Sequence, residues 1–178
     1  MTKTNCFKKK KKNQIEFFRK ILTTSSGKIY SPRYKSVNKL IENLKNNVKQ
    51  RQTLHSCTID NKNEKIFILR EVNKTKKNFT KKMIVNPKEH ILWDYRFQVS
   101  SIKHEIELKI IDLNSWVFIK NYFFKKKNRR LKFRILQSLP LIKKKNKFFI
   151  PFVNDALELK ESGIDFFFNP INSLTINK

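Results

Sequence analysis

The chain has 178 residues, of which 41 are Lys or Arg and 14 are Asp or Glu, so its formal net charge is +27 at pH 7. Like charges in a compact body repel each other by about 1 kcal/mol per pair at ~4 Å even in water, so we expect a polyanionic partner to offset this surplus. Only two glycines are present, which excludes the glycine-rich phosphate-binding loops of many nucleotide-dependent enzymes.

The composition nevertheless allows a folded core. Leu, Ile, Val and Phe make up 58 of the 178 residues, well above the roughly 20% below which chains usually stay disordered. We predict an α+β fold with an N-terminal basic tail and helices, a small antiparallel sheet in the middle, basic loops and a short C-terminal helix. The predicted segments are a basic tail (1–12), basic amphipathic helices (13–52), a hairpin and antiparallel sheet body (53–124), a basic loop block (125–149), and a short helix with an acidic C-terminal end (150–178).

Helical periodicity dominates the first segment after the tail. Ile15, Phe18, Ile21 and Leu22 share one face, which predicts a helix over residues 14–22 that stops within Thr23–Gly27. A second helix is predicted over residues 34–51, because its apolar residues form one stripe while lysines occupy the other faces. The residues of this stripe are Val37, Leu40, Ile41, Leu44 and Val48.

Strand patterns follow in the middle of the chain. Leu54–Ile59 and Lys65–Val72 predict a hairpin whose turn lies in Asp60–Glu64, a run rich in Asn and Asp. Three further strands are predicted at Ile91–Val99, Ile102–Ile111 and Trp116–Phe124.

The strand predicted at Ile102–Ile111 has the clearest alternation. Its apolar row includes Ile102, Ile106 and Leu108, and the other face is charged. His104 falls in the apolar row, and we expect it to be a buried histidine with a structural role.

The densest basic block, residues 125–147, contains an apolar segment in which Pro140 breaks any helix. We expect two basic loops anchored by this segment. Asn154 is predicted to cap a short helix that runs to Ser162 and stops at Gly163.

Positive charge is concentrated at both sides of a neutral centre. Residues 1–56 hold 15 basic and 2 acidic residues, residues 91–120 hold 4 of each, and residues 121–149 hold 11 basic residues and no acidic one. Residues 150–178 hold 2 basic and 4 acidic residues. This placement predicts RNA contacts at the two basic blocks and protein contacts at the acidic end. The predicted RNA-binding residues are Lys8, Lys9, Lys10, Lys11, Lys12, Arg19, Lys35, Lys39, Lys45, Lys49, Arg51, Lys125, Lys126, Lys127, Arg129, Arg130, Lys132, Arg134, Lys143, Lys144, Lys145 and Lys147.

No catalytic or metal-binding motif is evident, so we expect no enzymatic activity, no cofactor and no metal. Glu105 and Glu107 are the strongest candidates for a Mg²⁺ site, but their alternation with lysines is typical of a solvated ion-pair face. His55 and Cys57 supply half of a metal site at most, and we interpret them as ordinary strand residues. No apolar run approaches the ~18 residues of a membrane span.

The codon preference of the gene is visible in the protein. Lys, Asn, Ile and Phe, whose codons are rich in A and T, account for 88 of the 178 residues, while Ala occurs only at Ala156. In this composition and in its lysine-rich extensions the chain resembles ribosomal proteins encoded in AT-rich mitochondrial genomes of protists. The resemblance covers the whole chain and implies a structural, non-catalytic component that binds ribosomal RNA and neighbouring ribosomal proteins inside the mitochondrion.

Three alternatives remain open at this point. The chain is also compatible with a DNA-compacting protein of an organelle or nucleus, and the Lys8–Lys12 run resembles a nuclear address or part of an import sequence. A second alternative is an accessory subunit of a respiratory membrane complex, against which the absence of a predicted span counts. The third is a nucleic-acid enzyme.

Overall fold

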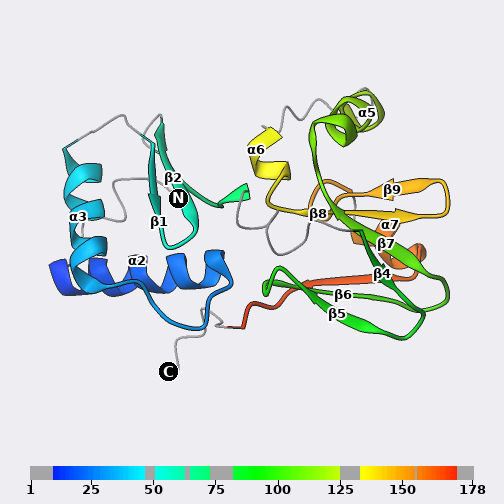
Figure 1. Ribbon diagram of the computed structural model, residues 1–178, viewed down its shortest axis with the longest axis horizontal. Helices are drawn as coiled ribbons and strands as arrows, with labels where there is room; N and C mark the ends of the chain where they lie inside the picture. The colour runs from blue at the N-terminus through cyan, green and yellow to red at the C-terminus, as the bar shows by residue number, and fades with distance from the viewer. Residues whose placement is uncertain are drawn as a thin grey trace. The chain divides into compact units, whose positions relative to one another are not determined.

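The computed structural model describes residues 10–46, 51–62, 65–72, 82–124, 133–154 and 156–171. These residues form five helices and ten strands in three small antiparallel sheets, so the predicted α+β class is confirmed (Figure 1). The chain divides into two compact units. We call Met1–Glu71 with Asn169–Lys178 the N-terminal unit, and Val72–Phe168 the central unit.

Two helices build one side of the N-terminal unit. Helix α2 (Lys11–Ser26) includes the predicted stretch and extends beyond it at both ends. It stops at Gly27, which has a left-handed φ of 64° and whose N–H donates to the Thr24 carbonyl. Helix α3 (Tyr34–Lys45) begins at the predicted residue but ends before Arg51, and residues 47–50 of the predicted helix lie outside the described residues.

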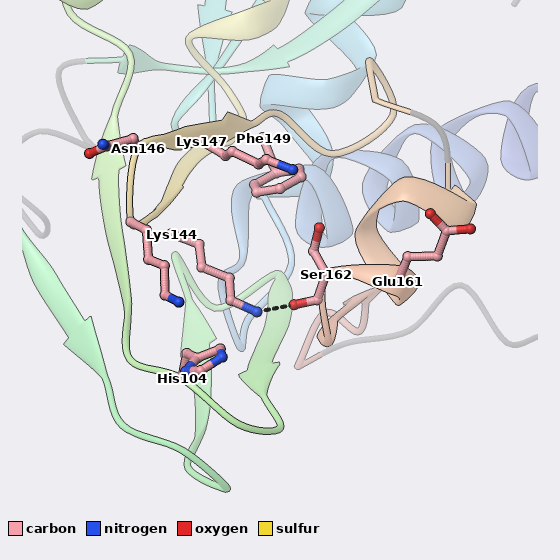
Figure 2. A pocket seen from close by; sticks show the side chains of 8 residues that line it. His104, Lys144, Asn146, Lys147, Phe149, Glu161 and Ser162 are labelled. Atoms are coloured by element: carbon pink, nitrogen blue, oxygen red, sulfur yellow. Dashed lines mark hydrogen bonds between the residues drawn. The ribbon is translucent and has the colours of Figure 1, made fainter.

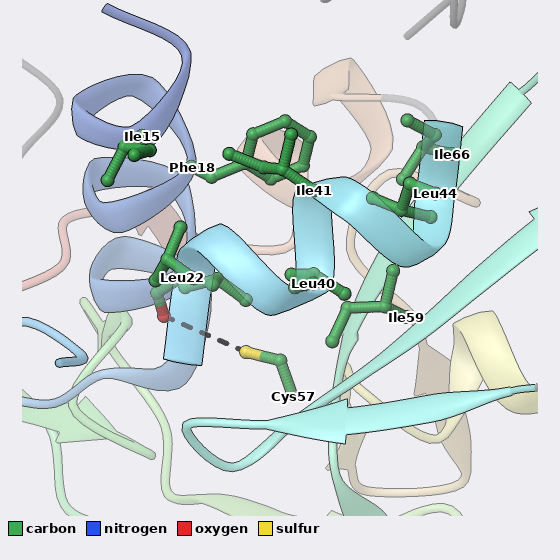
Figure 3. Close-up of a cluster of buried hydrophobic side chains, with 10 residues drawn as sticks. Ile15, Phe18, Leu22, Leu40, Ile41, Leu44, Cys57, Ile59 and Ile66 are labelled. Carbon is green, nitrogen blue, oxygen red and sulfur yellow. Dashed lines mark hydrogen bonds between the residues drawn. The ribbon is translucent and has the colours of Figure 1, made fainter. Parts of the chain in front are cut away.

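The apolar stripes of both helices meet a three-stranded sheet. Strands β1 (Gln52–Leu54), β2 (Cys57–Lys62) and β3 (Lys65–Arg70) pair in sequence order. Figure 3 shows the resulting core, in which side chains from both helices lie over β2 and β3. The core consists of Ile15, Phe18, Leu22, Val37, Leu40, Ile41, Leu44, Cys57, Ile59 and Ile66.

The predicted first strand of the hairpin is in fact two strands. Residues Leu54 and Cys57 pair across a two-residue turn, and both turn residues, His55 and Ser56, have positive φ (53° and 58°). Such a turn matches the twist of paired strands but usually contains Gly or Asn, which explains why the pattern did not reveal it.

The central unit holds two sheets. One has the order β4 (Met83–Val85), β7 (Ile106–Ile110), β8 (Pro140–Lys144) and β9 (Lys147–Phe149). The other has the order β10 (Ile164–Phe168), β6 (Phe97–Ser101) and β5 (His90–Trp93). Both sheets contribute to one apolar cluster that includes Trp93, Val99, Leu108 and Phe149.

Two of the predicted strands in this unit are shorter or broken. The stretch 91–99 is divided into β5 and β6 by a turn at Asp94 and Tyr95, both with positive φ. The stretch 102–111 is paired only from Ile106, because the Ile102 N–H donates to the Gly163 carbonyl instead of joining the strand. His104 therefore lies in an exposed loop, and the prediction that it is buried was wrong.

The prediction of a strand at Trp116–Phe124 was also wrong, because this segment lies in helix α5 (Leu113–Phe124). Asp112 starts the helix: its carboxylate accepts the Ser115 N–H at 2.7 Å, and its carbonyl accepts the Trp116 N–H at 2.9 Å. The N–H of Ser115 holds the pKa of the Asp112 carboxyl below its ordinary value. Helix α6 (Phe133–Leu136) packs with α5 through the rings of Trp116 and Phe133, whose centroids are 5.0 Å apart.

A short helix near the C-terminus was correctly predicted. Helix α7 (Ala156–Glu161) lies within the predicted range and is followed by Gly163, whose φ is 64°. The Asn154 side chain accepts the Ile150 N–H at 2.7 Å and donates to Glu158 at 3.0 Å. None of the helices in the described ranges has the length and apolar character needed to cross a bilayer.

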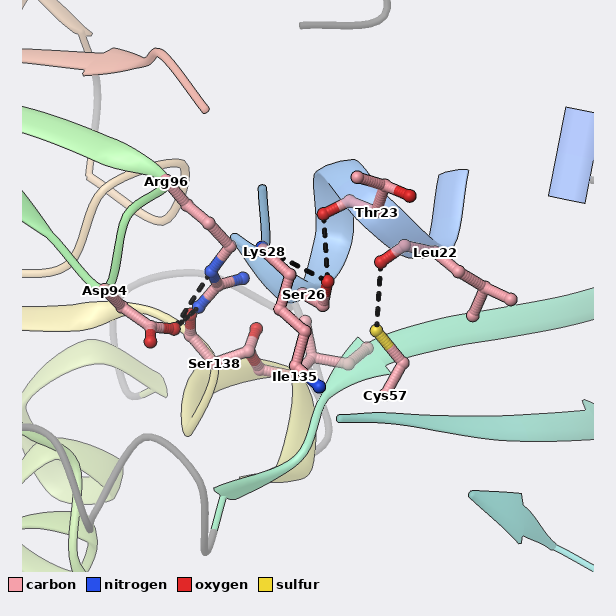
Figure 4. Close-up of polar contacts among 9 residues, drawn as sticks. All are labelled: Leu22, Thr23, Ser26, Lys28, Cys57, Asp94, Arg96, Ile135 and Ser138. Atoms are coloured by element: carbon pink, nitrogen blue, oxygen red, sulfur yellow. Dashed lines mark hydrogen bonds and ion pairs between the residues drawn. The ribbon is translucent and has the colours of Figure 1, made fainter. Parts of the chain in front are cut away.

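One ion pair in the central unit is buried. Arg96 donates to Asp94 Oδ2 through Nε (3.0 Å) and Nη2 (2.7 Å), and to the Ser138 carbonyl at 2.8 Å (Figure 4). Asp94 is 0% exposed and Arg96 4%. Because a buried charge without its partner is strongly unfavourable, this pair ties the β5–β6 turn to the segment after α6.

We predict that Arg96→Met destabilises the central unit by about 3–5 kcal/mol, because it leaves the Asp94 carboxylate buried and uncompensated. Urea unfolding followed by tryptophan fluorescence measures this, since both tryptophans, Trp93 and Trp116, belong to this unit. Lys82→Met is the matched control: Lys82 pairs with Glu107 at 2.9 Å but is 59% exposed, and its loss is expected to cost less than about 1 kcal/mol. Equal effects of the two variants would contradict this assignment.

Candidate nucleic-acid interface

Most of the predicted basic residues that the structure describes are exposed. In the N-terminal unit these are Lys10, Lys11, Lys12, Lys35, Lys39, Lys45 and Arg51, and in the central unit Arg134, Lys145 and Lys147. Lys143 and Lys144 are partly exposed and lie in strand β8, not in the loop that was predicted for them. The predicted residues outside the described ranges are Lys8, Lys9, Lys49, Lys125, Lys126, Lys127, Arg129, Arg130 and Lys132.

The outer face of α3 is cationic. Lys35 and Lys39 are one turn apart on the side opposite the buried stripe, and Glu42 continues the same row. Glu42 is shared between two neighbours, because it accepts the Asn38 amide at 2.7 Å and lies 3.9 Å from Lys11 of α2. This face therefore presents Lys35 and Lys39, and the Glu42 carboxylate beside them is shared with Asn38 and with Lys11 of α2.

Arg19 has a different environment. Its Nε donates to the Pro32 carbonyl at 3.1 Å and its Nη1 donates to Glu16 at 2.9 Å. These contacts use the guanidinium to hold the connection between α2 and α3. Arg19, which was predicted as an RNA-binding residue, therefore donates hydrogen bonds to groups of its own chain.

A pocket in the central unit gathers several cations. It has a volume of about 460 Å³ and opens at the β8–β9 hairpin (Figure 2). Residues from three separate segments line it: the loop after β6, the β8–β9 hairpin and the end of α7. These residues are His104, Lys144, Lys145, Asn146, Lys147, Phe149, Glu161 and Ser162.

The hairpin places its lysines on the pocket through a tight turn. Lys144 pairs with Lys147 across two turn residues, Lys145 and Asn146, and Lys145 has a positive φ of 51°. The Lys144 ammonium donates to the Ser162 carbonyl just after α7, as Figure 2 shows. This hydrogen bond ties the hairpin to the end of that helix.

Gly163 suits the turn at which these segments meet. Its φ of 64° favours glycine, whereas a Cβ there would make only ordinary contacts with Ile102 (3.8 Å) and the Lys144 ammonium (3.9 Å), so the backbone conformation and not the available space is the constraint. Its carbonyl accepts the Ile102 N–H, which brings the loop containing His104 to the pocket. The turn after α7 thus positions two walls of the pocket.

The cations of the pocket repel one another. The pKa of Lys144 is lowered first by desolvation and then by the charges of Lys145 and Lys103. The pKa of His104 is lowered by desolvation and then by Lys145, Lys144 and Lys103. An anion in this pocket would relieve the repulsion, so the site is suited to a phosphate group.

The sequence pattern indicated only part of this site. The run of lysines at 143–147 was recognised, but the contribution of Ser162 and the exposed position of His104 were not. No local pattern links these residues, because their segments meet through the backbone hydrogen bond between Ile102 and Gly163.

Metal-binding arrangements receive no support from the described part of the chain. Within it, no group of three or more His, Cys, Asp or Glu residues is placed to hold an ion. Glu107 forms an ion pair with Lys82, as expected for a strand face on which acidic and basic side chains pair. Cys57 is a buried strand residue whose thiol donates to the Leu22 carbonyl at 3.7 Å, whereas His55 lies in the turn before it.

Comparison with protein-family models, with curated proteins and with solved structures finds no significant match to this chain.

We predict that Lys145→Gln raises the pKa of His104 toward its ordinary value of 6.5, because it removes one of the charges that disfavour the imidazolium. Titration of the imidazole protons by NMR measures the shift, and a His104→Gln variant assigns the signal. Lys120→Gln, which removes an exposed lysine of α5, is expected to leave the pKa unchanged. If Lys145→Gln had no effect, the two side chains would not share one electrostatic site.

Proposed function

We propose that this chain binds folded RNA and is a structural constituent of the mitochondrial ribosome. The observation that carries the proposal is the pocket at the β8–β9 hairpin, where Lys144, Lys145 and Lys147 converge with His104. Neutralising phosphates with such cations releases condensed counterions, which is the main source of affinity in nucleic-acid binding.

The shape of the cationic surfaces favours folded RNA over a regular duplex. One surface is the convex outer face of α3, and the other is a concave pocket with Phe149 in its wall. A concave site accepts an isolated phosphate that projects from an irregular backbone, as occurs in the loops and bulges of folded RNA. A DNA-compacting protein would be better served by a continuous basic surface, so we keep that function as the second candidate.

The acidic end of the chain is suited to protein neighbours. Phe152, Phe167 and Phe168 are 64%, 59% and 47% exposed, and the rings of Phe152 and Phe168 pack on Phe97. Exposed aromatic residues of this kind are enriched at protein interfaces. We propose that neighbouring ribosomal proteins cover them.

The proposed location in the mitochondrion is supported by the abundance of Lys, Asn, Ile and Phe, whose codons are rich in A and T. The accessory subunit of a respiratory complex remains an alternative, because such a subunit need not cross the membrane itself. The charge of +27 favours a nucleic-acid partner over it.

We predict that Lys145→Gln with Lys147→Gln weakens binding to folded RNA and reduces the slope of log K against log salt. The slope is expected to become shallower by about 1.4. Each phosphate contact on an unpaired strand contributes ~0.7 to the slope, and the double variant loses two such contacts. Binding isotherms at several salt concentrations measure it. Lys88→Gln with Lys120→Gln removes the same charge from exposed positions that do not line the pocket and is expected to leave the slope nearly unchanged. An equal decrease in both double variants would show that the effect is only one of net charge.

We predict that in gradient sedimentation of native particles from the source organelle the chain migrates with one ribosomal subunit and is released by high salt. Electrostatic contacts to RNA weaken steeply with salt, which is the reason for the release. Immunodetection across the gradient measures the distribution. Recovery of the chain in membrane fractions after the ribosomes are dissociated would favour the respiratory complex instead.

A further inference from the structure

An aromatic side chain in the N-terminal unit is exposed beside basic groups. Tyr30 lies in the connection between α2 and α3 and is 67% exposed. The Lys28 ammonium lies 5.3 Å from the centre of its ring, and the imidazole of His55 meets the ring edge to face, with centroids 5.5 Å apart and planes at 81°. Two neighbours therefore hold the ring while most of it faces solvent.

The connection that carries Tyr30 is fixed at its base. The Ser26 hydroxyl donates to the Thr23 carbonyl at 2.9 Å and accepts the Lys28 N–H at 3.3 Å (Figure 4). The Thr23 hydroxyl donates to the Ser31 hydroxyl at 3.2 Å. The carbonyl of the buried Pro32 accepts a hydrogen bond from Arg19. The backbone is anchored on both sides of Tyr30, so little conformational entropy is lost when a ligand contacts its ring.

The turn that presents His55 has an uncommon backbone. His55 and Ser56 both have positive φ, a conformation that costs energy in residues other than glycine and occurs often at functional sites. Burial and the charge of Lys28 lower the pKa of His55, against a raising effect of its hydrogen bond with the Tyr30 backbone. A neutral imidazole packs against the tyrosine without adding charge to it.

The charges around this ring are suited to a nucleotide. The Lys28 ammonium lies by the ring, and the exposed Arg33 and Lys35 follow Tyr30 along the chain, whereas Arg70, which also acts on His55, is buried. The acidic residue Glu16 is linked to this connection by Arg19, whose guanidinium donates both to the Pro32 carbonyl and, at 2.9 Å, to the Glu16 carboxylate. A planar base on the ring would have the Lys28 ammonium beside it for its phosphate.

We propose that Tyr30 is a stacking platform for an unpaired base of RNA. The base lies on the tyrosine ring, and the Lys28 ammonium moves from the ring to the phosphate of the same nucleotide. This site lies in a different unit from the pocket at the β8–β9 hairpin and presents a largely exposed aromatic ring, whereas Phe149 in the pocket wall is buried. The inference rests on the proposed binding to RNA and extends it from phosphates to bases.

Calorimetric titration of the full chain with oligouridylate and with inorganic polyphosphate tests the proposal, because only the first ligand has bases. Tyr30→Leu keeps an apolar side chain and removes the ring. We expect it to weaken binding to oligouridylate about 5-fold or more and to leave binding to polyphosphate unchanged. Tyr30→Phe keeps the stacking surface and is expected to bind both ligands as the unaltered chain does.

The matched control is Tyr95→Leu, which removes another exposed tyrosine ring (47%) from the turn between β5 and β6 and is expected to change neither affinity. Circular dichroism verifies that each variant is folded. Unchanged binding of oligouridylate by Tyr30→Leu would overturn the platform, and so would an equal weakening with both ligands. If that variant bound RNA normally but were absent from sedimenting particles, Tyr30 would contact a protein and the proposal would be wrong.

The same titrations separate this inference from the proposed function. Salt-dependent binding of oligouridylate by the unaltered chain, with no effect of Tyr30→Leu, removes the platform and keeps the binding to RNA. If the unaltered chain bound polyphosphate but not oligouridylate, both proposals would fail.

Discussion

Repulsion among cations is the physical constraint on which the structure depends. The sequence supplies 41 basic residues and 14 acidic ones, so most positive side chains cannot be paired within the chain and must remain in solvent. Helix α3 shows the consequence: Leu40, Ile41 and Leu44 are buried, while Lys35 and Lys39 lie on the opposite face. Apolar burial on one side of each element, not ion pairing, holds the described units together.

Two places depart from this separation, and they do so in opposite ways. Asp94 and Arg96 are buried together, where their mutual attraction and the Ser138 carbonyl compensate for the hydration that both charges give up. At the β8–β9 hairpin the cations are brought together without an equal number of acids. Breaking the first arrangement would leave a buried charge without its partner. In the second, desolvation and then the neighbouring lysines lower the pKa of Lys144 and His104, and the gathered charges favour an anionic ligand.

Elements with a strong local period were predictable, and those decided by turns were not. The stripes of α2 and α3 identified both helices, because each apolar residue marks the same face. The strands at 54–59 and 91–99 were predicted as continuous because His55, Ser56, Asp94 and Tyr95 adopt positive φ without being glycine. The run 116–124 is apolar except at Lys120 and Asn121, so its periodicity did not distinguish a strand from a helix, and the Asp112 cap favours the helix.

The sequence by itself determined the sign and the placement of the charge, the α+β class and the lysine runs available for binding, since these are properties of neighbouring residues. Only the tertiary structure decided which of these residues meet. His104, Lys144 and Ser162 are far apart in sequence and converge through the turn at Gly163, whose left-handed backbone brings the hairpin and the loop after β6 together. Tyr30 and His55 likewise meet only because α2 packs on strands β2 and β3, which buries the apolar stripe of the helix and leaves its connecting loop exposed.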